Sequence, residues 1–223
     1  TKPVATAVVP ISAGRHIYKR EPSFPIAVAC DPAFNFVYEA NIRYLHHLGE
    51  VTYFSPLADT SLPDAGFVYL PGGYPELYLA ALSANRQMLQ SIRRYVESGG
   101  KLLAECGGMM YLCDEIRDKN GYVYPMAGVL HQSATMENMK LRLGYRTLLY
   151  NETRLKGHEF HYSRLVEQQN PLPSCAVAYT AKGVETDTPL YHYKNVWAGY
   201  THLYWADPVG NEWFTKFVID GNI

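Results

Sequence analysis

The most informative pattern in this chain lies at residues 101–110, Lys-Leu-Leu-Ala-Glu-Cys-Gly-Gly-Met-Met. Apolar residues run up to Cys106, and two glycines then open a stretch of helical character. A buried strand that turns sharply into a helix exposes the residue at the turn beside the free N–H groups and positive dipole end of the helix, which favour a thiolate. Small residues at the −2 and +2 positions, Ala104 and Gly108, fit such a nucleophile elbow. The pattern predicts a reactive Cys106, and the alternative is an inert buried cysteine.

The segments on either side of this turn predict an α/β fold. Short apolar runs at 25–30, 51–54, 67–70 and 101–105 alternate with helical patterns at 34–48 and 85–96. This alternation predicts a central, mostly parallel sheet with helices on both faces. From Tyr124 onward, alternating segments at 141–150, 158–162, 176–180 and 196–204 predict an antiparallel extension, followed by a closing helix at 206–219. Chemistry is expected where the parallel strands end and the helices begin.

The composition excludes several classes of function. The 223 residues carry a net charge of −1 and no basic run, so a nucleic-acid partner is not expected. No apolar stretch reaches membrane-spanning length, and no signal-peptide pattern opens the chain. Four scattered cysteines without C-x-x-C spacing predict neither disulfides nor a zinc ribbon, and they are typical of the cytoplasm. Residues 1–24 are rich in proline and are interpreted as a linker before one large domain at 25–223.

A glycine-rich loop and a histidine complete a candidate catalytic group. Pro71-Gly72-Gly73-Tyr74-Pro75-Glu76 follows a predicted strand, so the N–H group of Gly72 or Gly73 is a candidate oxyanion donor together with that of Gly107. An ordinary Gly-Pro turn is the alternative. Among the eight histidines, His202 lies between a strand-like run and the last helix, and it is the candidate base.

A metal site is not expected from the histidine pattern. His158 and His161 stand three residues apart on a predicted strand, where side chains at that spacing point to opposite faces. No further cluster of cysteine and histidine residues would complete a set of metal ligands.

Five motifs occur in order and carry a specific resemblance. They are Leu-Pro-Gly-Gly-Tyr-Pro-Glu-Leu (70–77), Ala-Glu-Cys-Gly-Gly-Met-Met-Tyr-Leu (104–112), Leu-Gly-Tyr-Arg (143–146), Gly-His-Glu-Phe-His-Tyr-Ser (157–163) and Tyr-Thr-His-Leu (200–203). Over residues 25–220 the chain resembles the glutaminase domain of cobyrinic acid a,c-diamide synthases. The resemblance implies a flavodoxin-like class I glutamine amidotransferase fold. The sirohydrochlorin a,c-diamide synthases of nickel-tetrapyrrole biosynthesis look alike in these motifs and remain an alternative.

The resemblance also implies a reaction and partners. Cys106 would attack the side-chain amide of L-glutamine, His202 would move the proton, and water would hydrolyse the thioester. Ammonia would then pass to an N-terminal synthetase domain that uses ATP and Mg²⁺ to amidate acetate side chains of a corrin or related tetrapyrrole. The motif G-x-x-x-x-G-K-[ST] is absent from the chain, so the ATP-binding domain is expected outside this sequence. No cofactor is expected in the glutaminase domain itself.

The sequence leaves the third member of the catalytic group open. Many class I glutaminases have a glutamate two residues after the histidine, and Tyr204 stands there in this chain. Glu159 or Asp31 would replace it, although a salt bridge is the favoured interpretation of Glu159.

The substrate pocket and two other functional classes also stay open. Tyr74, Tyr145, Arg146 and His161 are candidates for the glutamine pocket or for the face that meets the synthetase domain. A non-catalytic docking or regulatory module of the same fold is one alternative function, and a cysteine hydrolase or peptidase is another.

Overall fold

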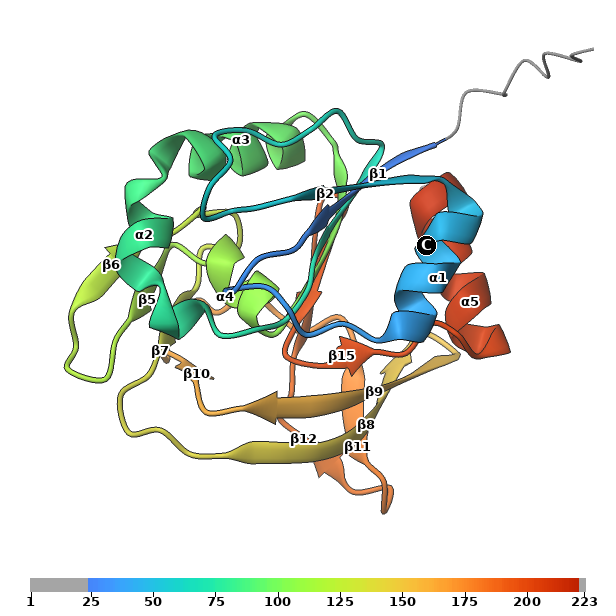
Figure 1. Cartoon of the computed structure of the whole chain (residues 1–223). Coiled ribbons are helices and arrows are strands. Elements are labelled where there is room, and N and C mark those ends of the chain that lie inside the picture. The colour runs from blue at the N-terminus through green and yellow to red at the C-terminus, as the bar shows by residue number, and fades with distance from the viewer. Residues whose placement is uncertain (1–23, 221–223) are drawn as a thin grey trace, which may run out of the picture.

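The computed structural model describes residues 24–220 of the chain. The predicted linker, residues 1–24, lies outside the described residues except for Phe24. Figure 1 shows a central sheet with helices packed against it and a second sheet beside it. The α/β class predicted from the sequence is therefore confirmed. No helix in the described part of the chain is long and apolar enough to cross a membrane.

The central sheet has the strand order β13–β14–β4–β3–β1–β2. Its strands are β1 (Pro25–Ala29), β2 (Glu50–Phe54), β3 (Phe67–Leu70), β4 (Lys101–Glu105), β13 (Leu190–Tyr193) and β14 (Val196–Gly199). Neighbouring strands from β2 to β14 run parallel, and β13 at the edge is antiparallel. Leu70 at the end of β3 lies opposite Ala104 of β4. The loop after Leu70 therefore begins next to the turn at Cys106, because parallel strands end at the same edge.

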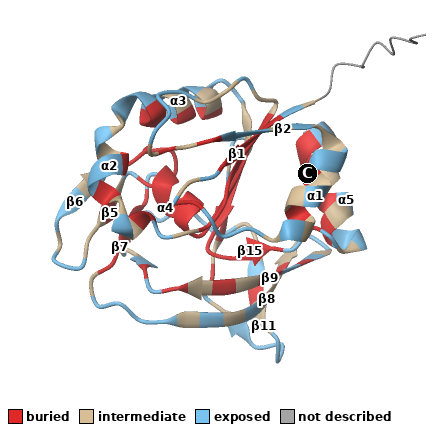
Figure 2. Ribbon diagram, viewed as in Figure 1, coloured by how far each residue is buried: buried red, intermediate tan, exposed pale blue. Residues whose placement is uncertain are grey.

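Helices cover both faces of this sheet, as predicted. One hydrophobic core lies under α2 (Leu79–Ala84), α3 (Arg86–Glu97) and α4 (Gly107–Leu112). A second core lies under α1 (Glu39–Leu48), α5 (Pro208–Thr215) and the π-helical turn η2 (Lys216–Asp220). A short 3₁₀ turn, η1 (Pro75–Leu77), follows the glycine loop. In Figure 2 the buried residues of these helices line the sides that face the sheet.

The second half of the chain forms the predicted antiparallel extension. A five-stranded sheet has the order β12–β11–β8–β9–β15, and all of its neighbouring strands are antiparallel. Its strands are β8 (Arg142–Tyr150), β9 (Thr153–His161), β11 (Val177–Thr180), β12 (Glu185–Thr186) and β15 (His202–Leu203). A small sheet contains β5 (Glu115–Arg117), β6 (Val123–Pro125), β7 (Ser133–Thr135) and β10 (Arg164–Leu165). Strand β15 pairs with β9 and places His202 opposite His158.

Several predicted elements have different bounds in the structure. The strand predicted at 158–162 is β9, which already begins at Thr153. The helix predicted at 34–48 begins only at Glu39, because the Asp31 carboxylate accepts the N–H groups of Ala33 and Phe34 and Phe36 pairs with the backbone of Gly72. The run predicted as one strand at 196–204 is two strands, β14 and β15, in different sheets. The chain leaves the central sheet after Gly199, and this break carries His202 across to β9.

Candidate active site

Cys106 occupies the sharp turn between β4 and α4 that the sequence predicts. Its backbone has φ 48° and ψ −105°, a combination that residues with a side chain rarely adopt. The Cys106 N–H donates to the carbonyl of Gly199 at 2.7 Å, which fixes the turn against β14. A Cβ atom on Gly108 would lie 2.1 Å from the carbonyl oxygen of Leu70, so only glycine lets α4 approach β3 this closely.

The two glycine segments meet beside this turn. A Cβ atom on Gly107 would lie 3.2 Å from the backbone nitrogen of Gly73 and 2.7 Å from Cδ of Pro75. A Cβ atom on Gly73 would in turn lie 2.2 Å from the carbonyl oxygen of Ala33. The backbone after β3 is therefore packed against the first residue of α4, as an oxyanion site built from both segments requires.

The same loop also contacts the imidazole of His202. A Cβ atom on Gly72 would lie 2.1 Å from Cε1 of His202, so a glycine is needed at this position to leave room for the ring. The imidazole is buried, and the ring of Phe36 packs against it with centroids 4.3 Å apart. Cys106 and His202 thus lie at one edge of the central sheet, on either side of the glycine loop.

The Cys106 thiol is protonated in the resting site. Burial raises the pKa of this thiol to about 12, and the charge of Glu76 adds to the shift, whereas the Gly107 N–H acts in the opposite direction. The N–H group at the start of α4 thus acts in the expected direction, but burial outweighs it and the pKa of the thiol is raised. Desolvation and nearby carboxylates outweigh the dipole of a helix of only six residues.

The His202 imidazole is neutral in the resting site. Burial lowers its pKa to about 3, and the charges of His158 and His161 act in the same direction. A neutral ring has one nitrogen free to accept a proton, which a general base requires. The cysteine and the histidine therefore rest as an uncharged pair.

Glu105 is a buried acid that the sequence reasoning missed. Its Oε2 accepts a hydrogen bond from the Tyr69 hydroxyl at 2.6 Å, its Oε1 accepts the Leu203 N–H at 2.9 Å, and Oε2 lies 4.0 Å from Nδ1 of His202. Burial raises the pKa of the Glu105 carboxyl to about 8. The available signal was a charged residue after three apolar residues at the end of β4, directly before the nucleophile.

The two acids predicted to assist His202 have other partners. Glu159 is buried, and its carboxylate contacts His161, Arg146 and the Thr188 hydroxyl. The favoured interpretation of Glu159 as an ion-pair residue is confirmed, although the pair is buried rather than at the surface. Asp31 accepts backbone N–H groups in its own turn, together with the Ser55 hydroxyl and the Leu57 N–H group.

The predicted pocket residues separate into two groups. Tyr74 and His161 line a small cavity at Cys106, together with Glu76 and Met110. Tyr145 is largely exposed and packs against His158 on the outer face of the extension. Arg146, the next residue along β8, turns to the opposite face and pairs with Glu159. His158 and His161 also lie on opposite faces of β9, as the strand spacing predicts.

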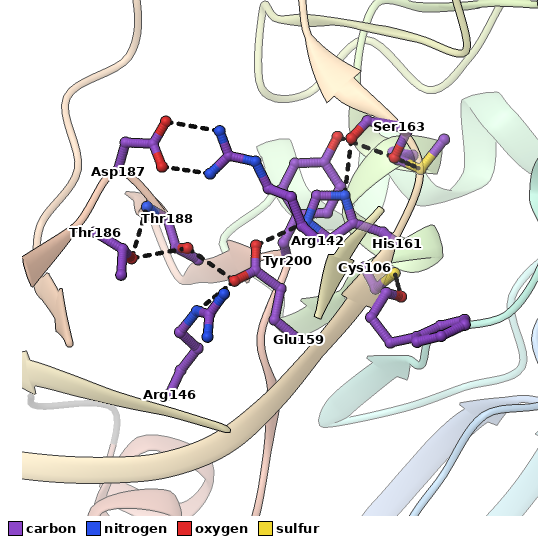
Figure 3. A network of polar contacts seen from close by, with 12 residues as sticks. Cys106, Arg142, Arg146, Glu159, His161, Ser163, Thr186, Asp187, Thr188 and Tyr200 are labelled. Carbon is purple, nitrogen blue, oxygen red and sulfur yellow. Dashed lines mark hydrogen bonds and ion pairs between the residues drawn. The ribbon is translucent and has the colours of Figure 1, made fainter. Parts of the chain in front are cut away.

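A polar network lies behind the cysteine cavity, as Figure 3 shows. His161 contacts the Glu159 carboxylate through Nε2 at 2.7 Å and the Ser163 carbonyl through Nδ1 at 2.8 Å, and its ring stacks on Tyr200. Both ring nitrogens of His161 thus lie within hydrogen-bond distance of an oxygen atom. His161 and Ser163 also line a larger cavity of about 620 Å³. Within residues 24–220, no group of three or more His, Cys, Asp and Glu side chains could hold a metal ion.

Comparison with known proteins identifies the class to which this fold and site belong. The family model of the CobB/CobQ-like glutamine amidotransferase domain matches residues 25–209. The chain belongs to this family, and the resemblance found in its motifs is confirmed.

Curated relatives support the same assignment. Hydrogenobyrinate a,c-diamide synthase of Pseudomonas aeruginosa is 40% identical over 185 residues, and the match covers 80% of this chain and 41% of the relative. Cobyrinate a,c-diamide synthase of Fusobacterium nucleatum is 40% identical over 188 residues, with 80% and 41% covered. The chain thus spans about two fifths of the length of these relatives.

Solved structures support the fold. PurLQS of Thermotoga maritima aligns with a TM-score of 0.56 at 16% identity, covering 89% of this chain and 96% of that chain. A glutamine amidotransferase of Thermotoga maritima aligns with a TM-score of 0.53 at 12% identity, covering 89% of this chain and 83% of that chain. The predicted class I glutamine amidotransferase fold is confirmed.

Proposed function

We propose that this chain is the glutamine-hydrolysing part of an a,c-diamide synthase that amidates acetate side chains of a cobyrinate-like tetrapyrrole. Membership of the CobB/CobQ-like family and two relatives named for a,c-diamide synthesis support this assignment. The observation that carries it is the strained turn at Cys106, held beside the packed backbones of Gly73 and Gly107. A buried structural cysteine needs neither the strain nor the glycine contacts.

The proposed reaction begins with transfer of the thiol proton to His202 as Sγ attacks the side-chain carbonyl carbon of glutamine. The raised pKa of the thiol and the lowered pKa of the imidazole disfavour a preformed ion pair, so the transfer accompanies the attack. The N–H groups of Gly107 and of Gly73 or Gly72 would hold the oxygen of the tetrahedral intermediate. His202 returns its proton to the departing ammonia, and water then hydrolyses the thioester to glutamate.

The ammonia acceptor would be activated outside this sequence. A carboxylate does not react with ammonia at a useful rate until it is activated, and the resemblance implies an acyl phosphate made with ATP and Mg²⁺ in a synthetase domain. The relatives are more than twice as long as the matched segment, which leaves room for such a domain in them. We propose that domain as the partner of this chain and the cytoplasm as the compartment.

Labelling with 6-diazo-5-oxo-L-norleucine, a glutamine analogue that alkylates glutaminase nucleophiles, tests the site. Mass spectrometry of the treated chain is expected to find one adduct on the peptide containing Cys106 and none in Cys106→Ala. His202→Asn should slow the labelling without loss of circular-dichroism signal. An unlabelled wild-type chain, or ammonia release by Cys106→Ala, would overturn the proposal.

The acceptor needs a separate assay with the full-length protein. Cobyrinate, hydrogenobyrinate and sirohydrochlorin are supplied with glutamine, ATP and Mg²⁺, and amidation is followed by mass spectrometry. Two amidations of cobyrinate or hydrogenobyrinate are expected. Preferential amidation of sirohydrochlorin would place the chain with the nickel-tetrapyrrole enzymes instead.

A further inference from the structure

The imidazole of His202 has a nitrogen without a partner. Nδ1 is buried and makes no hydrogen bond within the described part of the chain, although the ring is fixed by Gly72 on one side and Phe36 on the other. An unpaired buried nitrogen costs free energy, and the cost grows when the ring becomes charged. A base that must accept a proton here needs a nearby acceptor for its second N–H.

Glu105 is placed to be that acceptor. Its carboxylate is 2% exposed and is held from two sides, by the Tyr69 hydroxyl on Oε2 and by the Leu203 N–H on Oε1. Leu203 is the residue after His202, so one hydrogen bond ties the acid to the strand that carries the base. The remaining 4.0 Å between Oε2 and Nδ1 is about 1 Å longer than a hydrogen bond, a gap that a small rotation of either side chain would close.

The other candidates for this role are occupied or exposed. Glu159 is engaged by Arg146 and His161, and Tyr204 is 39% exposed with its ring against Tyr38. Tyr204 stands where many class I glutaminases have their orienting glutamate, and it offers a phenol in place of a carboxylate.

Building on the proposed glutaminase, we propose that Glu105 is the positioning residue for His202, supplied from the position directly before the nucleophile. Its carboxylate fixes the tautomer in which Nδ1 carries the proton and leaves Nε2 free to take the proton of Cys106. It also balances the positive charge of the imidazolium during the attack. The acid that supports the base, Glu105, is then the last residue of β4, and the nucleophile Cys106 is the residue directly after it.

The surroundings of Glu105 give this role a pH dependence. The carboxyl faces Tyr69 of β3 and His202 of β15, it lies within electrostatic range of Tyr38 and of the Cys106 thiol, and no lysine or arginine of residues 24–220 forms an ion pair with it. The charges of His158, His161 and Glu159 of β9 also act on the imidazole. Burial raises the pKa of the Glu105 carboxyl and holds it partly protonated near neutral pH, and only its ionised form balances an imidazolium.

Glu105→Gln tests the proposal because it keeps the size of the side chain and removes its charge. Steady-state glutamine hydrolysis by the protein in its active, full-length form is expected to lose between about 10-fold and 10³-fold in kcat, with KM changed less than about threefold. The rise of wild-type kcat/KM with pH toward about 8, the pKa of this carboxyl, should be absent in the variant. A purely structural role would leave that rise in place.

Tyr69→Phe is the matched control. It removes the other hydrogen bond to Oε2 in the same buried site, yet it leaves the carboxylate in place, so most of kcat and the pH-dependent rise should remain. Equal losses of kcat in Glu105→Gln and Tyr69→Phe, or an unchanged pH profile in Glu105→Gln, would overturn the proposal. Failure of the glutaminase itself is a separate outcome, seen as an unlabelled Cys106 in the wild-type chain.

Discussion

At the scale of single residues, the backbone of Cys106 carries strain that its side chain does not explain. A φ of 48° with ψ −105° brings Cβ close to the neighbouring peptide groups, and glycine would relieve that crowding. The hydrogen bond from the Cys106 N–H to Gly199 and the packing of Gly108 on Leu70 hold the turn in this state. A residue that is held in a strained backbone conformation, at a cost in folding free energy, is typical of functional sites.

Cys106→Gly should therefore be more stable than Cys106→Ala. Relief of strain, roughly 1–3 kcal/mol, exceeds the extra entropy of glycine in the unfolded chain, roughly 0.5–1 kcal/mol, so we expect a net gain of about 1 kcal/mol. Denaturant unfolding of both variants measures it. Cys113 is the control, because it is equally buried with φ −62°, and there the alanine variant should be the more stable. If the glycine variant were the more stable at both positions, or the alanine variant at both, the backbone strain inferred at Cys106 would be contradicted.

The raised pKa of the Cys106 thiol predicts how it alkylates. The fraction of thiolate rises with pH toward about 12, so the iodoacetamide rate of the substrate-free chain should keep increasing above about pH 9 without a plateau at neutral pH. Peptide mass spectrometry separates Cys106 from the exposed Cys30. A rate that is flat between about pH 6 and 8 would instead indicate a preformed thiolate–imidazolium pair.

The sequence predicted the turn at Cys106 better than the surroundings of the candidate residues. Cys106 and the glycines were selected because their spacing indicates the local turn geometry, and His202 because it lies between a strand-like run and the last helix. The orienting acid was sought at Glu159, since no local pattern reports that β9 turns this side chain toward His161. Glu105 was interpreted as part of an apolar run, because the imidazole it faces lies far away in the sequence.

At the scale of elements, the loop after β3 contacts both the candidate base and the helix that follows the nucleophile. Gly72 touches the His202 imidazole and Gly73 touches the start of α4, so the loop determines how β15 sits relative to the nucleophile. Strands β1 to β4 of the central sheet were predicted almost to the residue, because buried parallel strands form continuous apolar runs. Strand β13 was not predicted, and β14 was expected in the antiparallel extension. The start of α1 and the break between β14 and β15 were not predicted, because both depend on contacts with segments that are distant in the sequence.

Gly72→Ala should remove glutaminase activity while the chain stays folded. The new methyl group would lie 2.1 Å from Cε1 of His202, so the imidazole must move by more than about 1 Å, and we expect a loss of about 100-fold or more in kcat. Gly183→Ala is the control, because it also strains a glycine, with φ +75°, but meets nothing within 4 Å. It should cost stability and leave kcat unchanged. Near-normal kcat in Gly72→Ala would show that the ring position is not critical.

At the scale of the whole molecule, a buried ionic network joins the antiparallel extension to the central sheet. Glu159 of β9 contacts Arg146 of β8 and the hydroxyl of Thr188, which lies between β12 of the extension and β13 of the central sheet. His161 adds a stacked contact with Tyr200, which connects β14 to β15. The extension carries His202 and the central sheet carries Cys106, so this network helps to hold the two candidate catalytic residues together.

Glu159→Gln should therefore destabilise the protein by about 3–5 kcal/mol at neutral pH, because it leaves the charge of Arg146 buried without a counter-ion. Asp187→Asn is the control, since the Arg142–Asp187 pair is solvent-exposed and should contribute less than about 1 kcal/mol.

His161 and Arg146 hold the pKa of Glu159 below its usual value of 4.5 despite burial, so the folded state binds fewer protons than the unfolded state. The stabilisation is thus present above that value and is lost as the pH falls further. Urea unfolding across this range measures the difference between wild type and variant, and a difference that is small at neutral pH or does not shrink in acid would show that the network does not hold the two sheets together.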